Sequence, residues 1–134
     1  MVRFAPLECP EGNPGQSLTV RSESGITTLS DVLIGDVWVC AGQSNMAFAL
    51  NRATGGSDAA AAANDPLIRI CDVSGRRTGP GDATPRDLET AAWKIASPAS
   101  VPDFSAVGYF FGKNLRGSIG VPIGLIDTSV GGTR

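Results

Sequence analysis

Histidine is absent from the sequence, and no apolar run approaches the ~20 residues that a membrane-spanning helix needs. Residues 1 to 10 also lack the charged start and apolar core of a signal peptide, so localisation stays open. The 11 basic and 13 acidic residues give a net charge of −2 without any basic run. This balance argues against nucleic acid or a membrane as a partner and is compatible with a small neutral or weakly polar substrate.

The three cysteines, Cys9, Cys40 and Cys71, are an odd number without the spacing of metal ligands. Because there is no histidine to complete a zinc set, we expect no metal site. Cys40 and Cys71 fall in apolar, strand-like stretches and should be buried thiols. The pattern assigns no disulfide partner to Cys9.

The first 30 residues differ in character from the rest of this chain of 134 residues. Prolines and glycines punctuate residues 6 to 15, residues 17 to 21 then alternate polar and apolar side chains, and residues 26 to 29 form a second extended piece. We therefore expect a short β-hairpin and connector over residues 1 to 30. With 42% hydrophobic and 18% charged residues, the chain as a whole should form one globular domain or less.

An apolar, β-branched and aromatic run at residues 37 to 41 stops at Gly42 and is followed by a hydroxyl, two amides and a new apolar segment. This order predicts a strand, a tight turn and a helix over residues 46 to 50. A serine in such a turn lies at the carboxyl edge of a sheet, near free backbone N–H groups, so Ser44 is a candidate nucleophile. The alternative is that Ser44 or Asn45 caps the helix. The pattern G-x-S-x-G is not met, because Met46 occupies its last position.

Further elements alternate along the chain. Alanines predict a helix over residues 58 to 63, and residues 67 to 73 read as a strand. Residues 74 to 86 are rich in glycine, proline and charge and should be an exposed loop, either an active-site rim or a plain connector. Residues 92 to 95 suggest a short extended piece.

The strongest helical pattern covers residues 104 to 116, with Asp103 as a plausible N-cap and Gly117 as a stop. Its apolar stripe should face the core and consists of Phe104, Val107, Phe111 and Leu115. A strand over residues 123 to 127 follows.

This order predicts an α/β chain with a mostly parallel sheet. In a flavodoxin-like arrangement the first and third strands are neighbours, and their carboxyl ends lie at one edge of the sheet. The turn after residues 36 to 41 would then face the loop after residues 123 to 127, which places Ser44 beside Gly131. The pair Gly131 and Gly132 can alternatively be a simple turn between a strand and a helix.

Residues 35 to 46, GDVWVCAGQSNM, resemble the nucleophile block of the SGNH hydrolases, specifically of the sialate O-acetylesterase branch. Residues 104 to 112 and 122 to 133 resemble the helix, strand and glycine block that follow in that branch. Two spaced motifs in the right order are more specific than either alone. The resemblance implies that residues 31 to 134 are the amino-terminal part of a three-layer, flavodoxin-like catalytic domain, here incomplete. Residues 1 to 30 would be the remnant of an accessory β-rich domain.

The resemblance also implies a site. Ser44 would be the nucleophile, and the N–H groups of Ser44 and Gly131 would bind the oxyanion, with Gly132 as the near alternative. Gln43 and Asn45 complete the candidate set of oxyanion and substrate-binding residues. The implied substrates are O-acetylated sugars, without a metal or organic cofactor. Members of this family are often secreted, periplasmic or lysosomal.

The pattern departs from the family in one respect. The SGNH hydrolases also use an asparagine donor and a late Asp-x-x-His that supplies the base, and neither block is found here. Without a base a serine hydroxyl is a weak nucleophile. Asp36 should lie away from the site, and Asp127 is a poor substitute for imidazole. Three readings follow: an esterase, a non-catalytic carbohydrate-binding module, or an incomplete product that needs a missing carboxy-terminal half or a partner chain.

Overall fold

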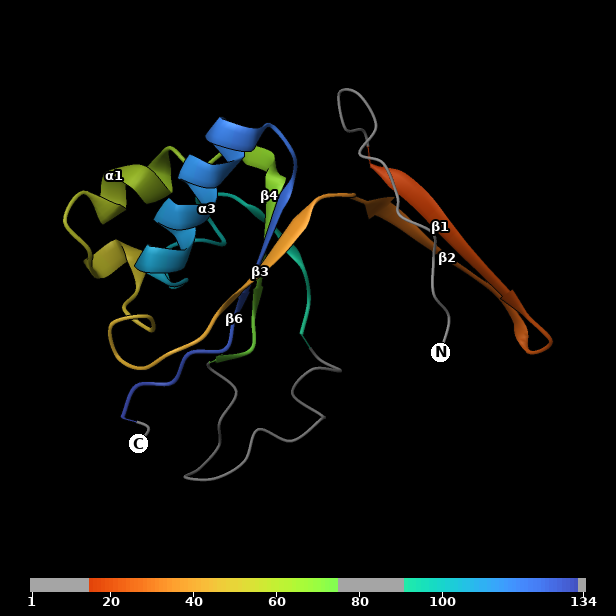
Figure 1. Cartoon of the computed structure of the whole chain (residues 1–134), viewed down its shortest axis with the longest axis horizontal. Helices are drawn as coiled ribbons and strands as arrows, with labels where there is room; N and C mark the ends of the chain where they lie inside the picture. The colour runs from red at the N-terminus through yellow and green to blue at the C-terminus, as the bar shows by residue number, and fades with distance from the viewer. Residues whose placement is uncertain (1–14, 75–90, 133–134) are drawn as a thin grey trace.

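The computed structural model describes residues 15–74 and 91–132 (Figure 1). The expected loop at 74–86 and Cys9 therefore lie almost wholly outside the described residues. The expected hairpin is present: β1 (Gln16–Ser22) pairs antiparallel with β2 (Gly25–Val32). In Figure 1 this hairpin projects from the side of the main body.

The main body is built on a four-stranded sheet with the order β3-β6-β4-β5. β6 (Ile123–Asp127) lies in the interior, parallel to both β3 (Asp36–Cys40) and β4 (Asp65–Asp72). β5 (Lys94–Ala96) pairs antiparallel with β4 at one edge. The expected α/β fold with a mainly parallel sheet is thus confirmed, as is the pairing of its first and third strands. Within the described residues, β3 forms the other edge.

The helical segments of the described residues are η1 (Leu50–Arg52), α1 (Gly56–Ala61) and α3 (Ala106–Ile119). α3 packs against β4 and β6 of the sheet, and η1 packs against both α1 and α3. The expected bounds of α3 were wrong at both ends. Ser105, not Asp103, is its N-cap, and its side chain accepts a hydrogen bond from the Gly108 N–H. At the other end the helix continues through Gly117 and stops at Gly120, whose φ of 75° is left-handed and suits glycine. No helix of the described ranges is long and apolar enough to cross a membrane.

The face that α3 buries also differs from the expected stripe. Phe104, just before the helix, is buried, but Val107 and Phe111 are 51% and 41% exposed. The small residues Gly108 and Gly112 face the sheet instead. A Cβ on Gly108 would lie 2.8 Å from the Cys40 Sγ, and one on Gly112 would lie 2.7 Å from Leu125 Cδ1. The lack of a side chain therefore brings the helix close to β3 and β6, an effect that counting large apolar residues does not reveal.

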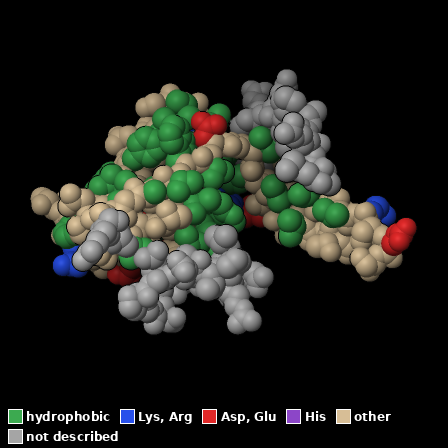
Figure 2. Space-filling model, turned by 60° about the horizontal axis from the view of Figure 1, so that its bottom comes forward, with side chains coloured by type: hydrophobic (Ala, Val, Ile, Leu, Met, Phe, Trp, Pro, Cys, Tyr) green, Lys and Arg blue, Asp and Glu red, His purple; other side chains and the backbone are tan. Residues whose placement is uncertain are grey.

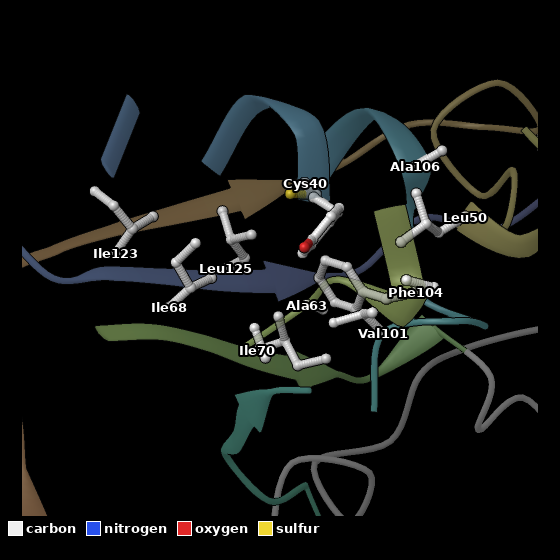
Figure 3. Packing of buried hydrophobic residues seen from close by; sticks show 13 residues of the cluster. Cys40, Leu50, Ala63, Ile68, Ile70, Val101, Phe104, Ala106, Ile123 and Leu125 are labelled. Carbon is white, nitrogen blue, oxygen red and sulfur yellow. The ribbon is translucent and has the colours of Figure 1, made fainter. Parts of the chain in front are cut away.

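The core fills the space between α1, α3 and one face of the sheet, as Figure 3 shows. Side chains of β4 and β6 meet the segment before α3 there. The largest apolar side chains that are almost fully buried are Phe104, Leu50, Ile68, Ile123, Leu125 and Val101. Cys40 and Cys71 are buried thiols, as expected. Along β6, buried residues alternate with less buried ones. Because successive side chains of a strand point to opposite faces, this pattern indicates that the described helices cover one face of the sheet and leave the other more open.

Candidate active site

The turn after β3 is well defined, but the helix expected over residues 46 to 50 is not formed. The Ala47 N–H donates to the Gln43 carbonyl at 2.8 Å, which closes a single turn over residues 44–47. The chain then extends and bonds to the segment before α3, where the Phe48 carbonyl accepts from the Ala106 N–H and the Leu50 N–H donates to the Phe104 carbonyl. These long-range backbone bonds replace the local bonds that a helix would have made.

Ser44 lies in this turn and is exposed, together with its neighbours Gln43 and Asn45. Within the part of the chain that the structure describes, the Ser44 and Asn45 side chains make no hydrogen bond to a backbone N–H, so neither acts as a helix cap. Gly42 precedes them with a φ of 153°, which a residue with a side chain rarely adopts. This glycine allows the chain to leave β3 sharply and present Ser44 at the carboxyl edge of the sheet.

The loop after β6 lies alongside this turn. The Thr128 N–H donates to the Cys40 carbonyl and the Val130 N–H donates to the Gly42 carbonyl, both at 3.0 Å. Gly131 consequently lies against Ser44: a Cβ built on Gly131 would be 3.8 Å from Ser44 Cα. Ser44 and Gly131 are thus neighbours, as the strand order predicted. Gly132, with a φ of 77°, makes the turn that follows.

Asp127, at the carboxyl end of β6, is only 3% exposed, and its carboxylate is already occupied. The Asp127 Oδ1 accepts from the Ser129 N–H at 2.9 Å and from the Ser129 Oγ at 2.6 Å. Burial raises the pKa of the Asp127 carboxyl, and the nearby Asp72 carboxylate acts in the same direction, whereas the Ser129 hydrogen bonds oppose it. Asp127 therefore shapes the loop that carries Gly131. Asp36 begins β3, at the opposite end from Ser44, as expected.

A second link between the site and α3 could not be read from the sequence. The Ser105 Oγ, which caps α3, also lies 3.4 Å from the Met46 Sδ, so the helix start is in contact with the Ser44 turn. Ser105 and Met46 are 59 positions apart and belong to no shared motif. The only available signal was that serine is a good N-cap residue, and Asp103 offered a competing choice.

Two of the hollows on the described surface lie along the sheet, and Ser44 lines neither of them. The larger, about 570 Å³ and mainly apolar, lies where β2 meets the amino ends of β3 and β6, and its lining includes Val37, Trp93 and Gly124. The smaller, about 320 Å³ and more polar, is lined by residues that include Asp72, Lys94 and Asp103. Among the described residues, no group of three or more His, Cys, Asp or Glu side chains is arranged to hold a metal ion.

Comparison with known proteins agrees with this geometry. No protein-family model matches the chain. It is 31% identical to mouse sialate O-acetylesterase over 90% of its own length and 35% identical to the human sialate O-acetylesterase over 77%. In structure it matches a carbohydrate acetylesterase from Xanthomonas citri with a TM-score of 0.75 and 41% identity over 88% of this chain.

The chain spans about a quarter of the length of these proteins: 24% of the mouse protein, 21% of the human protein and 27% of the Xanthomonas citri chain. The matches agree with the two motifs quoted from the sequence, and the fold places those motifs side by side at one edge of a parallel sheet. In sequence and in fold, the chain therefore resembles the amino-terminal part of the sialate O-acetylesterase-like branch of the SGNH hydrolase superfamily.

Proposed function

We propose that this chain is the nucleophile-bearing part of a carbohydrate O-acetylesterase, with residues 31 to 134 as the amino-terminal part of the catalytic domain. Residues 1 to 30 would be a β-rich connector or the remnant of an accessory domain. The observation that carries the proposal is the contact between exposed Ser44 and Gly131, held by backbone hydrogen bonds between their two loops. The names of the relatives support acetylated sugars as the substrate class.

In the proposed reaction the Ser44 Oγ attacks the acetyl carbonyl carbon while a base takes the hydroxyl proton. The resulting oxyanion accepts hydrogen bonds from the N–H groups of Ser44 and Gly131, with Gly132 as the alternative donor. The bond to the sugar oxygen then breaks, and the sugar leaves as an alcohol with the proton from the base. Water attacks the acetyl-serine, releases acetate and restores the hydroxyl. The amides of Gln43 and Asn45 would hydrogen-bond to the sugar.

The base is the part that this chain does not supply. The sequence has no histidine, and the Asp127 carboxylate is bonded to Ser129. We therefore expect the isolated chain to hydrolyse an activated acetate ester no faster than its Ser44→Ala variant does. This absence of a base is what favours the second candidate, a catalytically incomplete piece or a non-catalytic carbohydrate-binding module. A Ser44-dependent rate in the isolated chain would instead show that a base is present.

The proposal is tested in a chimera in which this chain replaces the matching part of the Xanthomonas citri carbohydrate acetylesterase. Acetate release from an O-acetylated sugar is measured for the chimera and for two variants. Ser44→Ala should lower kcat/KM by at least about 1000-fold, because the nucleophile is lost. Ser118→Ala, at an exposed position on α3, should stay within about twofold of the parent chimera, as expected for a surface substitution. A folded chimera without activity, or an active Ser44→Ala variant, would refute the assignment.

A further inference from the structure

The smaller of the two hollows, here called the Lys94 hollow, brings charged side chains of both signs together. Asp72 ends β4, Lys94 begins β5 and Asp103 lies in the segment before α3, and all three are exposed. Charged residues make up only 18% of the chain, and on the face drawn in Figure 2 they form small spots among hydrophobic and uncharged surface. A hollow lined by three of them is therefore a candidate site for a polar ligand.

The polar atoms of the Lys94 hollow are only partly used within the protein. The Asp72 Oδ1 accepts from the Ser74 N–H at 2.8 Å and from the Ser74 Oγ at 2.6 Å. The Asp103 Oδ1 accepts from the Asn51 Nδ2 at 3.0 Å. Among the described residues, no hydrogen bond reaches the Oδ2 of either carboxylate, and Lys94 forms no ion pair. Each carboxylate is thus held through one oxygen and has the other available for a ligand, as is the Lys94 ammonium.

The hollow lies at the same edge of the sheet as the Ser44 turn. The strand register pairs Asp127 with Cys40 on one side and with Asp72 on the other, so these three residues form a row across the carboxyl ends of three strands. Because neighbouring strands are about 4.8 Å apart, Asp72 lies roughly 10 Å from Cys40, the last residue of the strand that leads to Ser44. The hollow is therefore too distant to hold the acetyl group and close enough to hold another part of the same substrate.

The lining of the hollow favours an uncharged sugar unit. A carboxylate only accepts hydrogen bonds and an ammonium only donates them, whereas a hydroxyl does both. Neighbouring hydroxyls of one sugar ring can therefore donate to Asp72 and Asp103 and accept from Lys94. Two carboxylates and one ammonium leave a net negative charge, which repels phosphate and carboxylate ligands. The volume of about 320 Å³ lies at the lower end of the range for small-molecule sites, about 300–1,000 Å³, and suits a single sugar ring.

We propose that the Lys94 hollow binds an uncharged sugar unit that neighbours the acetylated unit in the same sugar chain, through hydrogen bonds to Asp72, Lys94 and Asp103. This inference rests on the proposed function, which supplies sugars as the substrate class. The three residues then determine specificity, because a neutral oligosaccharide that reaches from Ser44 to the hollow gains contacts that a single, carboxylate-bearing sugar does not. A metal ion fits the hollow less well, since the Lys94 ammonium would repel it.

The test compares two sugars that differ in one group: methyl β-glucoside and methyl β-glucuronide, in which a carboxylate replaces the hydroxymethyl group. Neither contains an acetyl ester, so NMR titrations of the backbone amides measure binding to this chain without turnover. Lys94→Met removes the donor and its charge but keeps a long apolar stem. Asp103→Asn removes one negative charge and keeps an acceptor for Asn51. Lys113→Met is the matched control, because Lys113 is the other lysine of the chain and is exposed on α3.

We expect methyl β-glucoside to shift the amides around Lys94 and Asp103 and to bind at least about fivefold more tightly than the glucuronide. Lys94→Met should raise the Kd for the glucoside at least about fivefold, because a hydrogen bond from a charged group is lost. Asp103→Asn should narrow the preference for the neutral sugar, which a merely structural effect would not do. Lys113→Met should change neither the Kd nor the preference. Circular dichroism checks that each variant keeps its fold.

Three results would each overturn the inference: no amide shift around Lys94 and Asp103 with the glucoside, tighter binding of the glucuronide, or an unchanged Kd in Lys94→Met. Shifts confined to the Ser44 turn would do the same, because the sugar would then bind elsewhere. Binding in the hollow together with an inactive chimera would count against the proposed esterase activity and leave the sugar site standing. An active chimera without binding in the hollow would refute the sugar site alone.

Discussion

Asp127 shows how a single buried carboxyl can shape the site without taking part in the chemistry. It lies at the end of the interior strand and holds Ser129 through two hydrogen bonds, two residues before Gly131. Its burial makes the charged form unfavourable, which is why its pKa is raised. The orientation of the loop that carries Gly131 thus depends on a group that is costly to ionise.

This arrangement predicts a pH dependence of stability. Because the pKa of Asp127 is raised in the folded state, its protonated form stabilises the fold fully below the unfolded value of 3.8. That contribution is lost as the pH rises through the folded pKa, by about 1.4 kcal/mol for each unit by which the pKa is raised. Asp127→Asn keeps an acceptor for Ser129 but cannot ionise, so its unfolding free energy should fall less between pH 4 and pH 7.

Urea denaturation at a series of pH values measures this difference. Asp58→Asn, an exposed change in the first turn of α1, serves as the control and should leave the pH profile close to that of the parent. A profile for Asp127→Asn that is parallel to the parent profile would show that the Asp127 carboxyl does not cause the change in unfolding free energy between pH 4 and pH 7.

α3 packs against the sheet through glycine. Gly112 lies against Leu125, and its missing side chain sets the distance between helix and sheet. Gly117 lies in the same helix, but a Cβ there would meet nothing within 4 Å. The same substitution at the two positions therefore separates helix propensity from packing.

Gly117→Ala should stabilise the protein by about 0.5–1 kcal/mol, because alanine loses less backbone entropy than glycine on forming a helix. Gly112→Ala gains the same helix propensity, but its methyl group would lie 2.7 Å from Leu125 Cδ1. The Leu125 side chain is fully buried and has little room to move away. Overpacking of this kind costs about 1–3 kcal/mol, so the net change should be destabilising. Urea denaturation of both variants gives the two signs, and equal signs would contradict this account of the packing.

At the scale of the whole molecule, the strands differ in how many neighbours they pair with. Among the described residues, β6 pairs with a strand on both sides, β3 pairs on one side, and β1 and β2 pair with each other. The hairpin is tied to the sheet by the Asp31 carboxylate, which accepts hydrogen bonds from Arg69 at 2.8 and 3.0 Å. This ion pair lowers the pKa of Asp31, but its setting is exposed and screened by solvent.

Amide hydrogen exchange should follow the same order. We expect the slowest exchange in β6, whose opening requires most of the sheet to unfold, and exchange at least about tenfold faster in β1 and β2, which can open locally. Mass spectrometry of peptides from each strand, at neutral pH and matched times, measures this ratio. Uniform protection across the hairpin and the sheet would show that the two parts unfold together.

The sequence alone determined the local elements and the family resemblance. The hairpin, the strands before Ser44 and Gly131, and the contact between these two residues follow from patterns that span a few residues, together with the rule that parallel strands share one carboxyl edge. The roles of Ser44, Gly131, Gly132, Gln43 and Asn45 remain predictions.

Only the tertiary structure decided which face of α3 is buried, how the chain leaves Ser44, and that β3 lies at an edge. Gly108 and Gly112 face the sheet because close approach favours the residue without a side chain, although larger apolar residues lie elsewhere on the helix. The predicted helix after Ser44 gave way to backbone bonds with the segment before α3. In each case the deciding contact joins segments far apart in the chain, and the free energy of such a contact has no signature in local sequence.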